Sequence, residues 1–238
     1  MEKYGANSNV LTQSTSSDTE ASLFINNHWP NRCWLEGTLP NNDNRWLQNL
    51  PTNTIIPTWN KLDENGIDDE LENQLINNHW QNMLEQTAMY LPIKTKNKMN
   101  HIRDGFTLKP LSSDKDITAW LDIVSDSFGY QIDRIVIDRL ISETDVKILM
   151  ATYQNKPAAS ALLYKTGDVI GLHQMGVKSE FQGQGLAKIF MLKIIDVCQQ
   201  WQGKNIVLQA SQAGKPLYEK LGFISQFIIK SYQYFYKV

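Results

Sequence analysis

The sequence predicts an α/β protein in which residues 101–238 form a sheet flanked by helices and a smaller domain precedes them. Three observations carry this prediction. Strand-like and helix-like apolar patterns alternate along residues 104–238. A loop with two glycines, Gln182 to Ala187, separates an apolar run from an amphipathic run. Residues 1–100 hold 18 asparagines, whereas only Asn155 and Asn205 follow.

The first hundred residues divide by composition. Residues 5–20 are mostly Ser, Thr, Asn, Gly and Ala, so we expect residues 1–20 to form a flexible segment. Residues 21–100 contain five of the seven tryptophans, which favours a packed unit. A short strand is expected over residues 53–59, and the apolar spacing predicts a helix over residues 68–90. We expect a linker at residues 91–101 and a domain boundary near residue 100.

One pentapeptide occurs twice in this part of the chain. Ile25-Asn26-Asn27-His28-Trp29 recurs as Ile76-Asn77-Asn78-His79-Trp80. Pro30 follows the first copy, whereas the second lies within a helical pattern. Coincidence in an asparagine-rich region is therefore favoured over a structural repeat.

Residues 101–238 have a clearer order of elements. Ser113, followed three residues later by Asp116, is expected to cap a helix that runs through Val124. The order predicted is β-α-α-β-β-β-α-β-α-β-β, with strands at 106–111, 146–153, 158–164, 169–177, 205–210, 223–229 and 232–238, and later helices at 133–141, 185–201 and 213–221.

Composition narrows the possible functions. The 238 residues are 42% hydrophobic and 20% charged, which is typical of a globular protein. The net charge of −2 gives no overall basic field for nucleic acid, but residues 101–238 carry +3 against −5 for residues 1–100. The first residues lack the pattern of a secretory signal, and no apolar window predicts a membrane helix. We expect a cytoplasmic protein with neither a nucleic acid nor a membrane as its partner.

The two-glycine loop predicts a phosphate site. Glycines at a strand–helix junction let successive backbone amides turn toward one point, and the positive end of the helix lies behind them. The amides of the whole loop would take part: Gln182, Gly183, Gln184, Gly185, Leu186 and Ala187. An ordinary strand–helix turn is the alternative reading.

A second motif makes the loop more specific. The loop, together with Pro216-Leu217-Tyr218-Glu219-Lys220-Leu221-Gly222-Phe223 about 30 residues later, resembles the GNAT superfamily of acetyl-CoA-dependent N-acetyltransferases over residues 104–238. The resemblance implies a mixed, mostly antiparallel twisted sheet flanked by helices. It implies that the loop amides hold the diphosphate of acetyl-CoA, while Met175, Gly176 and Val177 pair with the pantetheine arm. That arm would enter where the fourth and fifth strands splay.

The resemblance also implies catalytic residues. Tyr218 matches the tyrosine that lies near the thioester sulfur, and His173 matches a histidine of arylalkylamine N-acetyltransferases that is thought to act through water. An alkylammonium must lose its proton before attack, which costs about 4–5 kcal/mol at pH 7, and an imidazole of ordinary pKa near 6.5 suits a base. A packed aromatic and a structural histidine are the alternatives.

Some positions depart from the family or carry less information. Ser211 stands where the family often has an asparagine that contacts the cofactor, and Ile206 stands where ribosomal-protein N-terminal acetyltransferases carry a glutamate. Phe128 and Tyr130, between the first two helices, are candidates for the wall of an acceptor pocket, although core packing is equally open. No metal-ligand cluster is found in the sequence.

The sequence therefore predicts an N-acetyltransferase that moves an acetyl group from acetyl-CoA to a primary amine by direct attack. The acceptor, a small molecule or a peptide, is left open, as is a homodimer. Two alternatives remain: a non-catalytic acyl-CoA-binding or partner-binding module on the same scaffold, and a function in the first part as a protein- or sugar-binding unit. Residues 21–100 are expected to be an accessory domain or a degenerate GNAT-like domain.

Overall fold

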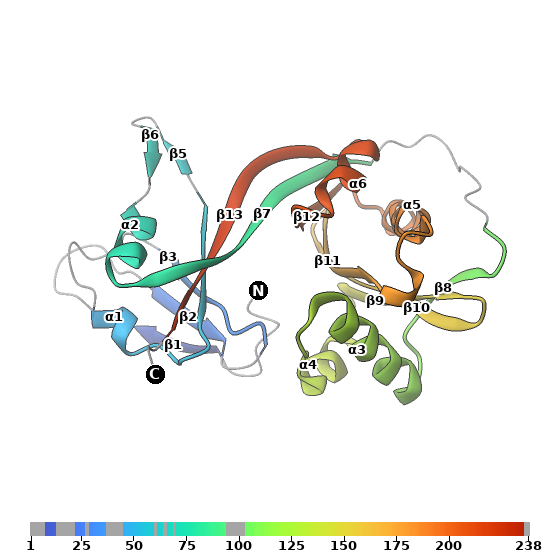
Figure 1. The fold of residues 1–238 in the computed structure, drawn as a ribbon, viewed down its shortest axis with the longest axis horizontal. Helices are drawn as coiled ribbons and strands as arrows, with labels where there is room; N and C mark the ends of the chain where they lie inside the picture. Colours follow the sequence, from blue (N-terminus) through green and yellow to red (C-terminus); the bar gives the residue numbers. More distant parts are fainter. Residues whose placement is uncertain are drawn as a thin grey trace. The chain divides into compact units, whose positions relative to one another are not determined.

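A computed structural model of the protein describes residues 8–12, 22–26, 29–36, 45–59, 61–63, 66–68, 70–93 and 103–235. The chain divides into two compact units (Figure 1). Unit 1 comprises Met1–Thr87 and Phe227–Val238, and unit 2 comprises Ala88–Gln226. Strands β7 (Trp80–Pro92) and β13 (Ile224–Tyr234) each contribute residues to both units.

Unit 2 is built on a mixed sheet. Its strand order is β8-β9-β10-β11-β12-β7-β13. Neighbouring strands from β8 to β11 pair antiparallel, whereas β11 and β12 pair in parallel. This arrangement confirms the predicted mixed, mostly antiparallel sheet. The strands not yet given bounds are β8 (Phe106–Pro110), β9 (Val146–Tyr153), β10 (Lys156–Thr166), β11 (Val169–Val177) and β12 (Asn205–Ala210).

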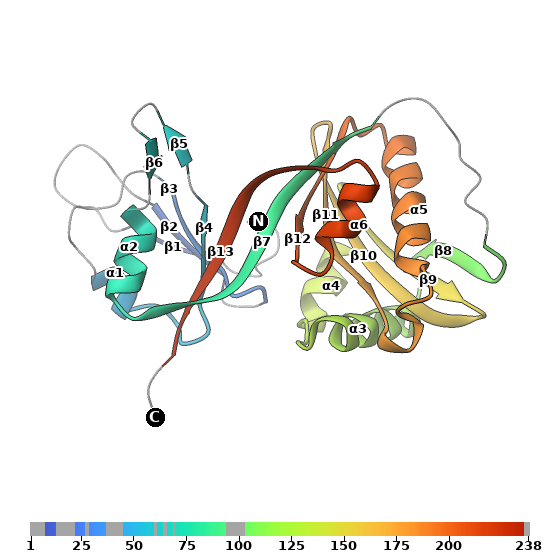
Figure 2. The same cartoon turned by 45° about the horizontal axis from the view of Figure 1, so that its top comes forward.

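Helices cover both faces of this sheet. Helices α3 (Asp114–Phe128) and α4 (Arg134–Leu140) lie on one face, and α5 (Leu186–Gln200) and α6 (Lys215–Lys220) lie on the other (Figure 2). The α5 face buries a large apolar cluster that includes Phe190 and Ile194, both fully buried. The expected cap of α3 is confirmed, because the Asp116 amide donates to the Ser113 hydroxyl oxygen at 3.2 Å.

The helix expected over residues 68–90 is wrong. Helix α2 spans only Glu70–Asn77, and β7 begins at Trp80. The reason is local, because His79 has a φ of 64°, in the left-handed region that ends a helix. The apolar residues beyond it, Ala88 and Met89, are buried in unit 2 as part of an extended strand.

The two strands expected at the C-terminal end are also wrong. The chain runs through as the single strand β13, because residues Ile229 to Gln233 pair continuously and antiparallel with β4 (Ile55–Trp59). The strand that lies beside β12 is β7, which comes from the first hundred residues. A strand that precedes residue 100 therefore completes the sheet of unit 2.

Unit 1 combines small sheets with two short helices. Strands β1 (Ser8–Thr12), β2 (Ser22–Asn26) and β3 (Cys33–Glu36) form one antiparallel sheet, and β5 (Lys61–Asp63) pairs with β6 (Gly66–Asp68). Helix α1 (Arg45–Gln48) and α2 pack near the core. Its buried residues include Cys33, Trp46, Ile56, Leu75 and Trp80.

Three expectations about the first hundred residues are affected. The expectation that residues 1–20 are flexible is wrong for residues 8–12, because these form β1 and pair with β2. Residues 1–7 and 13–21 lie outside the described part. The expected linker lies outside it from residue 94 to 102, and residues 91 and 92 belong to β7. The domains 21–100 and 101–238 differ from the compact units, because residues 88–92 belong to unit 2 and 227–238 to unit 1. That these ranges are the protein's domains stays a prediction.

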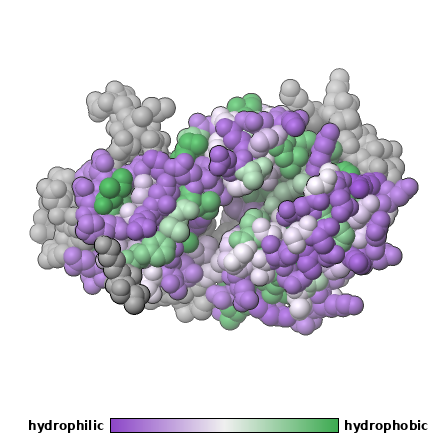
Figure 3. Space-filling model, in the orientation of Figure 1, coloured by the Kyte–Doolittle hydropathy of each residue, from purple (hydrophilic) through white to green (hydrophobic). Residues whose placement is uncertain are grey.

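The surface seen in Figure 3 is mostly hydrophilic, and hydrophobic side chains gather there in small groups. Within the described residues, no helix is both long enough and apolar enough to cross a membrane.

Candidate active site

The two-glycine loop has the backbone that the sequence predicts. Gly183 and Gly185 have φ values of 72° and 75°, a conformation that side chains rarely adopt. A Cβ atom at Gly183 would meet nothing within 4 Å, and one at Gly185 would meet only Arg103, at 4.0 Å. The glycines are therefore required by the turn of the backbone rather than by crowding. Gly185 caps the N-terminus of α5 without a side-chain hydrogen bond.

The loop leaves backbone amides available. Among the hydrogen bonds of the described residues, none is donated by the amides of Gly183 or Gly185. The first amides of α5, at Leu186 and Ala187, have no carbonyl within the helix to bond. Such amides at a helix N-terminus form a site for an anion. A diphosphate therefore fits this loop.

Two glutamine side chains brace the loop from inside. The Gln182 amide nitrogen donates to the carbonyl oxygen of Val177 at 2.9 Å, and that of Gln184 donates to Glu180 at 3.2 Å. Both side chains thus fold back onto the preceding turn, the 3-10 helix η2 (Ser179–Phe181). Any contact of Gln182 and Gln184 with a ligand would therefore come from their backbone groups.

Helix α3 anchors the start of the loop. The Asp126 carboxylate accepts hydrogen bonds from the Ser179 amide at 2.5 Å and from its hydroxyl at 2.9 Å. The hydrogen bond from the Ser179 backbone amide is the largest cause of the lowered pKa of the Asp126 carboxyl. The Lys178 ammonium lies 2.7 Å from Asp122, so it already has a partner on α3.

Arg103 supplies a positive charge beside the loop. Its Nη1 donates a hydrogen bond to the carbonyl oxygen of Gln184, and its Nη2 donates to the Tyr153 hydroxyl at 3.2 Å. The guanidinium carbon lies 4.8 Å from the centroid of the Tyr153 ring. That ring in turn meets Phe181 of η2 edge-on, at 6.1 Å and 89°. A guanidinium held in this way is well placed to pair with an anion on the loop amides.

The sequence analysis missed Arg103. The charge asymmetry of residues 101–238 pointed in the right direction but not to a residue. What places Arg103 at the loop is the pairing of β8 with β9, which brings Phe106 opposite Tyr153. A basic residue shortly before the first strand was the available signal.

The parallel pairing of β11 and β12 stops short. It runs from Val169 and Asn205 to Leu172 and Leu208, although β11 continues to Val177. The residues beyond Leu172 therefore have no ladder partner in β12. This is where the sequence analysis expected the two strands to separate, next to Met175, Gly176 and Val177.

A bulge reshapes β11 at the same point. Ser160 pairs with Gly176 and Leu162 with His173, so two residues of β11 stand opposite the single residue Ala161. Gln174 has a φ of 50°, and its carbonyl oxygen accepts a hydrogen bond from the Ser160 hydroxyl at 2.9 Å. Bulges of this kind redirect backbone groups beside functional sites.

Gly176 is required by a close approach. A Cβ atom there would lie 2.7 Å from Cβ of Ser127 and 2.9 Å from the ring of Phe128. The C-terminal end of α3 therefore packs directly on the backbone of β11.

Tyr218 lies beside the bulge on the α5 face. Its hydroxyl is 3.5 Å from the sulfur of Met175, and its ring packs edge-on against Phe223, with centroids 5.5 Å apart. The side chain is buried, and burial raises the pKa of Tyr218 to about 12. The phenol therefore stays protonated at neutral pH, and burial makes it a weaker acid than an exposed tyrosine.

His173 lies on the other face of the sheet. It pairs with Leu162, and Ser160 pairs with Gly176, which faces α3. Directly paired residues share a face, and the bulge keeps His173 on the face of Gly176. The His173 ring packs over Gly171 and is exposed. The structure thus places His173 and Tyr218 on opposite faces of one strand, at its bulge.

Phe128 and Tyr130 lie on the same side as His173. Their rings stack with centroids 5.7 Å apart, and each residue is 40% exposed. The Tyr130 hydroxyl and the Gln174 side-chain oxygen are 2.9 Å apart. The pair is therefore an exposed aromatic surface beside the bulge rather than part of the core.

Ser211 has a local partner. Its hydroxyl oxygen accepts a hydrogen bond from the Gly214 amide at 3.1 Å, in the turn that leads into α6. That bond helps to position Tyr218, which is the fourth residue of α6. Its expected contact with a cofactor stays a prediction.

Comparisons with known proteins agree with this geometry. The model of the acetyltransferase (GNAT) family matches residues 117–223. A GCN5-related N-acetyltransferase from Sphaerobacter thermophilus has a TM-score of 0.66 and 13% identity over 90% of this chain and 76% of that chain. A second one, from Kribbella flavida, has a TM-score of 0.62 and 11% identity over 93% and 89%. A tandem GNAT protein from the clavulanic acid biosynthesis pathway has a TM-score of 0.62 and 10% identity over 91% and 78%.

No curated protein matches the chain. At these identities the solved structures establish a likeness of fold alone. The family match rests on residues 117–223, which contain the bulge, the two-glycine loop and Tyr218. Residues 117–223 therefore match the acetyltransferase (GNAT) family, and they hold the candidate site.

Proposed function

We propose that unit 2 transfers the acetyl group of acetyl-CoA to a primary amine by direct attack. The single observation that carries this proposal is the combination at one end of β11. Loop amides without protein partners, at Gly183 and Gly185, lie next to a strand edge that leaves its parallel neighbour after Leu172. That combination suits a long ligand with a diphosphate at one end and amide groups along its arm.

Binding would use backbone groups and one guanidinium. The amides of Gly183, Gly185, Leu186 and Ala187 would hold the diphosphate, with Arg103 beside them. The free edge of Met175 to Val177 would pair with the amides of the pantetheine arm. When bound, acetyl-CoA would supply a thioester whose carbonyl carbon an amine attacks, with the thiol as leaving group.

Proton movements would fall to residues on the two faces of β11. His173, on the α3 face, would take the proton of the incoming ammonium, directly or through water. Tyr218, on the α5 face, would give its proton to the leaving sulfur, and the second proton that the attacking nitrogen loses would return to Tyr218 through solvent. In that transfer the new C–N bond replaces the C–S bond. Phe128 and Tyr130 would form one wall for the acceptor.

Two measurements on the full-length protein test the proposal. Acetyl-CoA should raise the melting temperature, because a ligand at 100 times its Kd adds about 2.7 kcal/mol to the unfolding free energy. A panel of primary amines should then release free thiol from acetyl-CoA. Thermal stabilisation without thiol release for any amine would favour a non-catalytic binding module. An unchanged melting temperature at millimolar acetyl-CoA would contradict both.

A further inference from the structure

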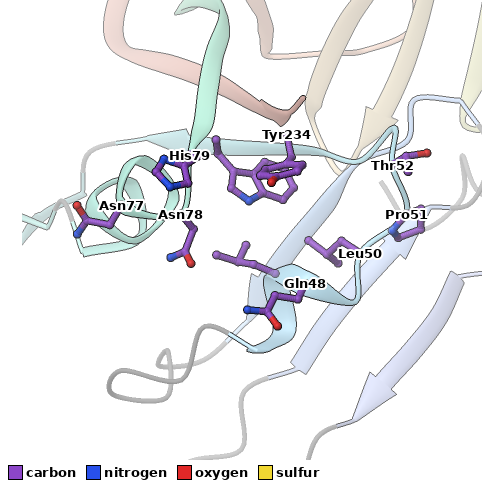
Figure 4. A pocket seen from close by; sticks show the side chains of 10 residues that line it. Gln48, Leu50, Pro51, Thr52, Asn77, Asn78, His79 and Tyr234 are labelled. Carbon is purple, nitrogen blue, oxygen red and sulfur yellow. The ribbon is translucent and has the colours of Figure 1, made fainter. Parts of the chain in front are cut away.

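Unit 1 contains a cavity of about 360 Å³ that the acetyltransferase site does not use. The cavity is lined by the segment from Leu47 to Thr52, by the turn between α2 and β7, and by Tyr234 (Figure 4). All of these residues belong to unit 1. Figure 4 shows the side chains of Asn78, His79 and Gln48 gathered around the apolar side chain of Leu50 and the ring of Tyr234.

The repeated pentapeptide contributes to this cavity. Four of the five residues in its second copy, Asn77-Asn78-His79-Trp80, line the cavity. In the first copy, by contrast, Ile25 and Asn26 lie in strand β2, so the two copies have different structures. The second copy of the pentapeptide, which has no part in the candidate active site, is thus located at this cavity.

His79 has a strained backbone at the edge of the cavity. Its φ of 64° is a conformation that glycine adopts freely and that costs other residues roughly 1 kcal/mol. A glycine would make the same turn but would place no imidazole beside the cavity. Strain of this kind is often retained where a side chain serves a site.

The described residues that line the cavity have hydrogen-bonding groups, and none of them is acidic, a lysine or an arginine. Gln48, Asn77 and Asn78 contribute amides, Thr52 a hydroxyl and His79 an imidazole. A side-chain amide has both donors and an acceptor. A hydroxyl group also donates and accepts, so the two can form hydrogen bonds in either direction. The Asn78 nitrogen already donates to Gln74 at 2.8 Å, which fixes the orientation of that amide. Among the described lining residues there is thus no lysine or arginine that would form an ion pair with a phosphate or a carboxylate.

The aromatic residues also limit the ligand. The rings of Trp80 and Tyr234 have centroids 6.0 Å apart and planes inclined by 54°. Rings in mutual contact at this angle leave no parallel slot into which a planar base could insert. They present apolar surface on which the C–H groups of a non-planar ring can pack.

The volume suits a small ligand. The cavity of about 360 Å³ lies at the lower end of the range of about 300–1,000 Å³ that small-molecule sites occupy. From the lining, the ring geometry and the volume together, we propose that unit 1 binds a neutral polyhydroxylated ligand, a monosaccharide or disaccharide, between Gln48, Asn77, Asn78 and the Trp80–Tyr234 pair.

The test uses the full-length protein and named sugars. Calorimetry and ligand-observed NMR are carried out with glucose, galactose, N-acetylglucosamine and maltose. Glucose 6-phosphate, glucuronate and adenosine serve as charged or planar comparisons. At least one neutral sugar should bind with a millimolar or lower Kd, and the comparison ligands should bind at least about tenfold more weakly. This binding should persist when the acetyltransferase loop carries Gly183→Ala, so it stands or falls separately from acetyl transfer.

Matched variants locate the binding. Gln48 and Asn77 are exposed, so replacing both with alanine should leave the fold intact, and the Kd should rise at least about tenfold. Gln81→Ala, an exposed position of the same unit outside the cavity, should leave the Kd unchanged. The proposal is overturned if no sugar binds at about 50 mM, if a charged ligand or adenosine binds best, or if the double variant binds as the parent does.

Discussion

The Tyr218 hydroxyl lies 3.5 Å from the sulfur of Met175, a residue of the bulge in β11. This contact joins the last helix of unit 2 to the strand edge proposed to hold the pantetheine arm. The proposed role of Tyr218 as the proton donor to the leaving sulfur depends on this contact.

Tyr218→Phe should therefore reduce turnover more than binding. The phenylalanine ring keeps the edge-on contact with Phe223, so the fold should be retained. Loss of the proton donor should lower kcat by about 10- to 100-fold, while KM for acetyl-CoA changes less than about twofold. Steady-state thiol release measures both constants. An equal loss in affinity, or full activity, would show that Tyr218 only packs in the core.

The left-handed glycines allow a matched pair of variants. Gly183 in the loop and Gly167 in the turn between β10 and β11 have φ values of 72° and 59°, and a Cβ atom at either would meet nothing within 4 Å. Each alanine variant should thus lose a similar free energy of unfolding, about 1–2 kcal/mol, from backbone strain alone. Denaturant titration measures that loss.

Only the loop variant should bind acetyl-CoA less well. Gly183→Ala should shift the amides and raise the Kd for acetyl-CoA at least about tenfold, whereas Gly167→Ala should leave it unchanged. Calorimetry gives both values. If the two variants bind alike, the loop does not hold the diphosphate.

Arg103 should contribute charge and rigidity to the same loop. Arg103→Ala removes the bond to the Gln184 carbonyl and the stacking on Tyr153, so the Kd for acetyl-CoA should rise about tenfold. Arg103→Lys should recover only part of it, because lysine lacks the planar fork. Arg139→Ala, an exposed arginine of α4, is the control. The difference between variant and parent should shrink in 1 M salt, and a salt-independent effect would argue against a charge contact.

The local elements of unit 2 were predictable because local signals agree with each other. The range of β12 and the cap of α3 were both predicted correctly, since apolar period and capping residues point to the same boundaries. The expected helix over residues 68–90 failed because Trp80 to Pro92 needs partners far along the chain to become β7. The sheet of unit 2, not the apolar spacing, decides the conformation of that segment.

The candidate site was predictable where the backbone carries it. The two glycines of the loop indicated a positive φ, which the structure contains. The position of Arg103, the bulge opposite Ala161 and the opposite faces of His173 and Tyr218 depend on the register between strands. A single sequence gives no register, so these features required the structure.

The stability of unit 2 should depend on pH through Asp116. The hydrogen bond from Lys109, above all, lowers the pKa of Asp116 to about 2. A carboxyl whose pKa is depressed in the folded protein stabilises it above the ordinary value near 3.9, and loses that contribution as the pH falls to about 2. Asp116→Asn should lower the melting temperature at pH 7 by several degrees, and the difference should fade between about pH 4 and pH 2.

A matched carboxylate separates this effect from general charge. Asp138 pairs with Arg134 at 3.4 Å on the exposed side of α4, where an ion pair contributes little. Asp138→Asn should thus change the melting temperature by less than about one degree at every pH. A constant difference for Asp116→Asn down to pH 2 would mean that packing, not ionisation, causes the loss.

Comparing two acceptors that differ in pKa tests whether His173 takes a proton or only shapes the strand. If its imidazole takes the proton of the ammonium, His173→Gln should lower kcat/KM at pH 7 by about 10- to 100-fold for an alkylamine. The acidic limb of the pH profile should disappear with it. An amine of low pKa is already neutral when it binds, so the same variant should lower kcat/KM for that amine much less. Because His173 lies on the α3 face and Tyr218 lies on the α5 face, the Tyr218→Phe variant should keep the acidic limb. A variant that loses equal activity with both acceptors would show that His173 only shapes the strand.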